Sequence, residues 1–103
     1  MKYQLVLQWP GSSIQDYDAM ISIEDALIAG IGEVAKVDGH DSGSGTVNIF
    51  LYADRPDLAL REVMRILGKE RFMTSGLKAA FRERKGNDYH ILWPPGLSEF
   101  SIM

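Results

Sequence analysis

The sequence predicts an α+β domain in which two helices cover one face of an antiparallel sheet. In several short segments apolar residues alternate with polar ones, which is the pattern of half-buried strands. In two other segments the apolar residues recur at spacings of three and four, which is the pattern of amphipathic helices. The segments follow one another in the order β-α-β-β-α-β-β, so the helices separate strands as in a split βαβ unit.

The first strand covers residues 3–9 and is stopped by the proline and glycine that follow it. Ser12 and Ser13 are candidates for the N-cap of the first helix, and Asp16 suits the positive end of its dipole. Apolar residues then recur with helical spacing as far as Ile31, and the glycines on either side of this residue indicate the end of the helix.

Residues 33–53 predict the second and third strands, joined by a loop at residues 38–45. This loop contains three glycines, two aspartates, two serines and one of the two histidines in the chain. Hairpin connections of this length are less common than two-residue turns and are more often functional. Asp, Ser and Gly are also the residues that ordinary turns use, so a purely local role in the fold is the alternative interpretation.

The second helix begins around Pro56, because proline is harmless in the first turn, and Gly68 indicates its end. Residues 77–84 and 89–93 alternate again and predict a terminal hairpin. The final residues 94–103 form a short tail that is too apolar to be dismissed as disordered.

Right-handed crossovers and the pairing of neighbouring strands predict the sheet order 5-4-1-3-2, a ferredoxin-like arrangement with an added C-terminal strand. The face expected to pack against the helices consists of Tyr3, Leu5, Leu7, Trp9, Ala35, Val37, Val47, Ile49, Leu51, Ala79 and Phe81. The helix-free face is expected to consist of Gln4, Val6, Gln8, Lys36, Asn48, Phe50, Tyr52, Lys78, Arg82 and Arg84. His90 falls on either face, depending on the length of the turn before it.

Composition fits one globular domain over residues 1–103, long enough to bury its own core. The absence of cysteine excludes thiol catalysis, cysteine-ligated zinc and iron–sulfur clusters. A net charge of -3 gives no overall attraction to nucleic acid or to anionic lipid. The N-terminal segment resembles neither a signal peptide nor a membrane span, so we expect a cytoplasmic protein without membrane contact.

One candidate site is the loop at residues 38–45. His40 is its candidate general base, and Asp38 or Asp41 is the group that would orient the imidazole. Ser42, Ser44 and Asn48 are the polar residues expected to contact a ligand there. The spacing matches neither a phosphate-binding loop nor a calcium loop, and no nucleophile motif accompanies the histidine. We therefore predict no metal and no cofactor.

A second candidate site is the helix-free face of the sheet. Val6, Phe50 and Tyr52 make an apolar centre, and Arg82 and Arg84 contribute to a polar rim, as at protein interfaces. Aromatic and basic side chains together are also typical of RNA-binding sheets. The third strand lacks the aromatic block of such sheets, and the net charge is negative, so a protein partner or a homodimer is favoured over nucleic acid.

Three short blocks, residues 37–41 (V-D-G-H-D), residues 43–45 (G-S-G) and residues 48–50 (N-I-F), resemble those of a family of short, stand-alone bacterial proteins without an established activity. The resemblance covers most of the chain. It implies a bacterial source and a single domain, and it carries over no substrate, cofactor or catalytic residue.

Our leading hypothesis is a non-enzymatic interaction module that associates through the helix-free face. Toxin neutralisation, as by small immunity proteins, is one concrete form of it, suggested by small size and acidic composition. The alternative is a small enzyme or ligand-binding protein that uses Asp38, His40 and Asp41.

Overall fold

The computed structural model describes residues 1–11, 17–43, 45–72 and 74–102. Its elements are β1 (Tyr3–Pro10), α1 (Tyr17–Gly30), β2 (Lys36–Gly43), β3 (Thr46–Ala53), α2 (Pro56–Lys69), β4 (Lys78–Glu83) and β5 (His90–Trp93). The predicted α+β class and element order are confirmed. Ser12, Ser13 and Asp16, proposed to start the first helix, and Ser44 of the proposed loop lie outside the described residues.

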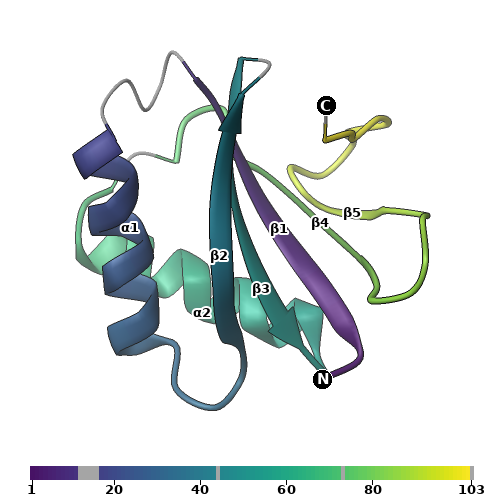
Figure 1. The fold of residues 1–103 in the computed structure, drawn as a ribbon, viewed down its shortest axis with the longest axis horizontal. Coiled ribbons are helices and arrows are strands. Elements are labelled where there is room, and N and C mark those ends of the chain that lie inside the picture. The colour runs from purple at the N-terminus through teal and green to yellow at the C-terminus, as the bar shows by residue number, and fades with distance from the viewer. Residues whose placement is uncertain (12–16, 44, 73, 103) are drawn as a thin grey trace.

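The five strands form one antiparallel sheet in the order β2-β3-β1-β4-β5, which confirms the predicted ferredoxin-like topology with β5 as the added strand. Figure 1 shows both helices on one side of this sheet and the C-terminal tail on the other. In the described part of the chain, neither helix is long and apolar enough to cross a membrane.

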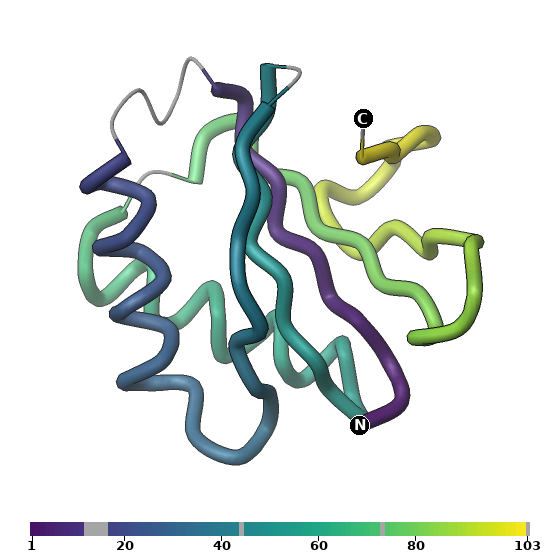
Figure 2. The backbone as a smooth tube through the Cα atoms, viewed as in Figure 1, coloured from purple at the N-terminus to yellow at the C-terminus, as the bar shows by residue number. Residues whose placement is uncertain are grey.

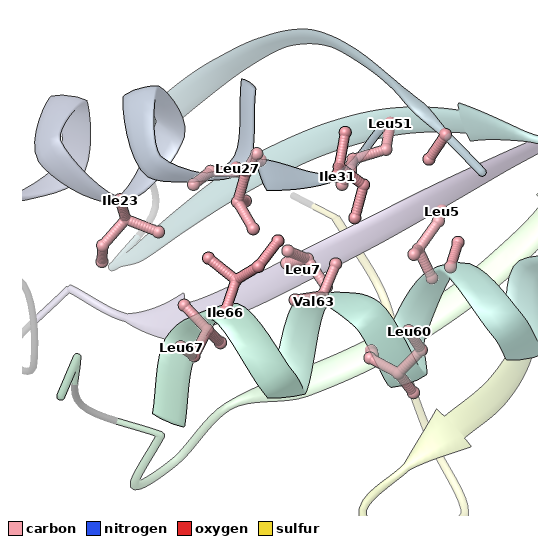
Figure 3. Packing of buried hydrophobic residues seen from close by; sticks show 14 of the residues in the cluster. Leu5, Leu7, Ile23, Leu27, Ile31, Leu51, Leu60, Val63, Ile66 and Leu67 are labelled. Carbon is pink, nitrogen blue, oxygen red and sulfur yellow. The ribbon is translucent and has the colours of Figure 1, made fainter. Parts of the chain in front are cut away.

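The hydrophobic core lies between the sheet and the two helices. Apolar residues of alternate positions in β1, β3 and β4 meet one face of each helix, and the fully or almost fully buried members include Leu5, Leu7, Trp9, Ile23, Leu27, Ile49, Leu51, Val63, Leu67 and Ala79. Figure 3 shows leucine and isoleucine side chains of both helices directed toward those of the sheet. Burying each large aliphatic side chain stabilises the fold by about 1.5–3 kcal/mol, so this layer fixes which sheet face is covered.

The second helix begins as its sequence predicts, with Pro56 in the first turn. Asp57 follows it and lies in the same turn. The backbone N–H of Leu58 lowers the pKa of the Asp57 carboxyl, and the neighbouring Arg55 guanidinium adds to this effect. The negative charge at this position therefore favours the helix start.

The prediction that residues 38–45 form a loop is wrong for most of this segment. Residues 38–43 belong to β2, and pairing with β3 continues until Gly43 faces Thr46. Gly45, just before β3, adopts a φ of 81°, a left-handed conformation that glycine reaches without strain. Pairing with β3 provides hydrogen-bond partners for backbone N–H and C=O groups of this polar segment, which explains why it forms a strand despite its loop-like composition.

An irregularity in β2 decides which way its side chains point. The register shifts between Val37 and Gly39, so that Val37 faces Leu51 and His40 faces Ile49. Without this bulge, simple alternation would put His40 on the face opposite to Val37. The bulge instead returns His40 to the helix side of the sheet.

The strand registers confirm the predicted membership of the helix-free face for every residue except Arg84, which lies after β4 and is placed on this face by its contact with the Tyr52 ring. Neither α1 nor α2 covers this face, as expected. The C-terminal tail lies over part of it, where the backbone carbonyl of Ser101 accepts a hydrogen bond from Gln8 Nε2 at 2.9 Å. Figure 2 shows the same tail, in yellow, on the side of the sheet away from the helices.

Candidate functional site

Side chains of the helix-free face are arranged in rows that cross neighbouring strands. The basic–aromatic row consists of Lys36, Tyr52, Gln4 and Arg82. The apolar row consists of Gly39, Phe50, Val6 and Ala80. The polar row consists of Asp41, Asn48, Gln8 and Lys78. The face therefore changes from basic to apolar to mixed polar along the strands.

The basic–aromatic row is held in place by specific contacts. Arg82 Nε donates a hydrogen bond to Gln4 Oε1 at 2.9 Å, and its Nη1 donates to the Gly86 carbonyl at 2.7 Å. Arg84, just after β4, lies over the Tyr52 ring with 4.1 Å between its guanidinium carbon and the ring centroid. A cation–π contact contributes about 0.5–1 kcal/mol at an exposed site. The hydrogen bonds of Arg82 and the ring contact of Arg84 therefore favour defined positions for both guanidinium groups.

The apolar row is less exposed than its sequence suggests. Val6 and Ala80 have no exposed surface, so the expectation that Val6 lies at an open apolar centre is wrong. Phe50 and Tyr52 are half-buried, and Arg84 is exposed. The surface available to a partner is therefore smaller than predicted: it excludes Val6 and is centred on Phe50, Tyr52 and Arg84.

A chain of hydrogen bonds links the polar row to the C-terminal tail. Asn48 is only 1% exposed; its Nδ2 donates to Asp41 Oδ1 at 2.9 Å, and its Oδ1 accepts from Gln8 Nε2 at 3.0 Å. Gln8 Nε2 also donates to the Ser101 carbonyl. Both hydrogens of the Gln8 amide group are thus used, as buried polar groups require. The chain connects β2, β3, β1 and the tail.

His40 belongs to a separate site between β2 and α1. Its Nδ1 lies 3.0 Å from Glu24 Oε2, and the Tyr17 ring meets the imidazole edge-on with centroids 5.9 Å apart. The His40 side chain is 27% exposed and that of Glu24 12% exposed. A carboxylate that holds Nδ1–H fixes the imidazole tautomer, which is one requirement of a general base.

The partners predicted for His40 are not those that the structure provides. Asp41 faces Asn48 on the helix-free face and so lies on the opposite side of the sheet from His40. Asp38 is exposed at the bulge. Ser42 shares the helix side with His40, because it faces Val47, and it is exposed. The proposed triple of Asp38, His40 and Asp41 is therefore not assembled on one face.

Glu24 is the residue that sequence reasoning missed, since a charged helix residue is most simply placed in solvent. A signal was present. Glu24 lies four residues after Met20 and three before Leu27, and both of these are buried. A carboxylate at that spacing shares the covered side of the helix and requires a partner there.

The pairing of β5 with β4 decides the position of His90, which the sequence left open. His90 faces Phe81, with ring centroids 5.1 Å apart, which resolves the two registers in favour of the helix side. Within the described residues, no three His, Asp or Glu side chains are grouped so that they could hold a metal ion.

Comparison with known proteins adds no further constraint: no protein-family model, curated protein or solved structure matches this chain. The class of protein is therefore given by the fold alone, a small ferredoxin-like α+β domain with one additional strand.

Proposed function

We propose that this chain is a cytoplasmic interaction module that binds a protein partner through the basic–aromatic end of its helix-free face. The observation that supports this most strongly is the arrangement of Arg84 over Tyr52, beside the half-buried Phe50. Aromatic residues and arginine are enriched among residues that dominate protein interfaces. Because these side chains are already held in place, binding would cost little of their conformational freedom.

The charge of this end favours an acidic partner. Lys36, Arg82 and Arg84 lie there, close to exposed Lys2, although the chain as a whole carries -3. A two-fold symmetric homodimer through this patch would bring like charges together, because the same surface is used on both subunits. An acidic patch on a different protein would be complementary and would also accelerate association. In the immunity-type form of this proposal, the toxin would present that acidic surface.

Nucleic acid fits the same end less well. The guanidinium of Arg84 covers one side of the Tyr52 ring, where a base would stack, and Arg82 is engaged with Gln4. Asp41 and Asn48 line the opposite end of β2 and β3, so a single strand running across the sheet would meet a carboxylate.

The test compares variants of the helix-free face with matched variants on the exposed sides of the two helices. Phe50→Asp alters the proposed interface, and Ile28→Asp is its control, because Ile28 is 58% exposed on α1. Arg84→Glu and Arg61→Glu form a second pair, with Arg61 exposed on α2. Native lysate is passed over each immobilised protein, and stoichiometrically retained proteins are identified and purified.

A protein retained by wild type, Ile28→Asp and Arg61→Glu, but lost with Phe50→Asp and Arg84→Glu, supports the proposal. The loss expected is at least about 30-fold in affinity, because truncating a central aromatic residue typically costs 2 kcal/mol or more. Retention that depends on Ile28 instead, or capture of RNA in place of protein, would contradict it.

A further inference from the structure

The opposite end of the helix-free face contains a cavity that the proposed interaction does not use. Its volume is about 760 Å³, and it opens between the polar row and the C-terminal tail. Gln8, Thr46 and Lys78 contribute its sheet side, residues 87–89 before β5 contribute a second wall, and residues 98–101 of the tail contribute the third. Pockets of roughly 300–1,000 Å³ are the usual size for small-molecule sites.

The charges around this cavity are mixed. Lys78 lies on the sheet side and is half-buried, and among the described residues no carboxylate forms an ion pair with it. Asp88 and Glu99 line the walls, and both are exposed. An anionic ligand would meet two carboxylates and a cationic ligand would meet the ammonium. A zwitterion can satisfy both signs at once.

An aromatic wall adjoins these charges. Tyr89 and Phe100 both line the cavity, and their ring centroids are 5.2 Å apart. The Arg82 guanidinium lies 5.8 Å from the Tyr89 ring centroid and helps to hold that ring. Ile91 adds an aliphatic surface from β5. A ligand that carries an apolar or aromatic group next to its charges therefore has a surface to pack against.

The sheet side of the cavity is rigid because of the hydrogen-bond chain described above. Gln8 is 6% exposed and is fixed from one side by Asn48 and from the other by the Ser101 carbonyl. The bond to Ser101 also anchors the tail that forms the third wall of the cavity. The sheet side and this point of the tail are therefore held in place before a ligand binds, which lowers the cost of ordering them.

We propose that this cavity binds a free amino acid with an aromatic side chain. The Lys78 ammonium binds the ligand carboxylate, Asp88 or Glu99 binds its ammonium, and the side chain packs against Tyr89, Phe100 and Ile91. This inference does not depend on the proposed interaction, which uses the Phe50 and Tyr52 end of the face.

The test uses L-phenylalanine as the probe, with isothermal titration calorimetry and backbone amide chemical shifts as readouts. Hydrocinnamic acid, which lacks the ammonium, and phenethylamine, which lacks the carboxylate, are matched controls. Lys78→Met removes the ammonium that is assigned to the ligand carboxylate. Lys69→Met is its control, because Lys69 is exposed at the end of α2 and does not line the cavity.

We expect L-phenylalanine to bind wild type and Lys69→Met equally, with chemical-shift changes in residues 87–89 and 98–101. Binding should weaken on the order of tenfold or more with Lys78→Met, because a charge-assisted hydrogen bond is lost. Each control compound should bind more weakly by a similar factor.

Phe100→Ala provides a second variant in the tail, outside the core, if Lys78→Met does not fold. It should also weaken binding of L-phenylalanine. Absence of L-phenylalanine binding to wild type would overturn the inference, as would equal binding of either control compound or unchanged binding to Lys78→Met. None of these results tests binding of a protein partner through Phe50, so each proposal can be refuted without affecting the other.

Discussion

The buried amide pair of Gln8 and Asn48 gives the sharpest stability prediction. Asn48→Ala removes the acceptor of one Gln8 N–H, which stays buried, and it removes the donor to Asp41. An unsatisfied buried donor costs about 1–3 kcal/mol. The Asp41 carboxylate is exposed and can bind water in place of Asn48, so losing the hydrogen bond between Asn48 and Asp41 adds about 1 kcal/mol or less.

We therefore expect the free energy of unfolding to fall by about 1–4 kcal/mol. For a domain of this size, that corresponds to a decrease in Tm of about 5–30 °C. Urea unfolding followed by the fluorescence of Trp9, which is fully buried, measures the change. Asn87→Ala is the control, because Asn87 is exposed before β5 and its loss should change stability by about 0.5 kcal/mol or less.

A double-mutant cycle with Gln8→Ala isolates the bond between the two amides. The loss in the double variant should be smaller than the sum of the single losses by about 1 kcal/mol, because either single change already breaks the bond. Strict additivity of the two losses, or an Asn48→Ala protein as stable as Asn87→Ala, would refute the hydrogen-bond chain between β1 and β3.

Further predictions concern α1, the β2–β3 turn and the start of α2. Glu24→Gln should lower the free energy of unfolding at neutral pH by about 1 kcal/mol, because it weakens a partly buried charge-assisted bond to His40; equal stability in thermal melts would contradict this. Gly45→Ala should cost about 1 kcal/mol through its positive φ, whereas Gly43→Ala, whose added methyl meets open space, should cost clearly less in urea unfolding. Asp57→Asn should lower Tm at neutral pH but not at a pH low enough to protonate the carboxyl. A carboxyl whose pKa is lowered in the folded state stabilises the fold only while it is ionised. A difference in Tm between wild type and Asp57→Asn that persists in acid would contradict this prediction.

Much of the fold follows from local sequence patterns. Alternation in residues 3–9 and 46–53 identifies the strands and both of their faces, and helical spacing with Pro56 and Gly68 identifies α2. These patterns succeed because one face of each element must be buried in the core. Strand order then follows from the general handedness and adjacency of connections.

The candidate sites were harder to predict because they depend on contacts distant in sequence. Gly39 is compatible with a bulge, but its polar, glycine-rich surroundings predict a loop, so the side of the sheet that His40 faces could not be predicted. His40 and Asp41 face opposite sides because they are consecutive residues of one strand. The burial of Val6 could not be predicted either, because alternation gives the face on which a residue lies and not how far its neighbours cover it. The position of the C-terminal tail depends on a contact between Ser101 and Gln8, which are 93 positions apart in the sequence.

The central claim is that the Phe50 and Tyr52 end of the helix-free face binds an acidic protein partner. The most direct measurement is the Kd of the purified partner for Phe50→Asp and Ile28→Asp, each at low and high salt. We predict that Phe50→Asp raises Kd at least about 30-fold, that Ile28→Asp leaves it unchanged, and that salt weakens wild-type binding. Equal Kd values for the two variants, or binding indifferent to salt, would contradict the claim.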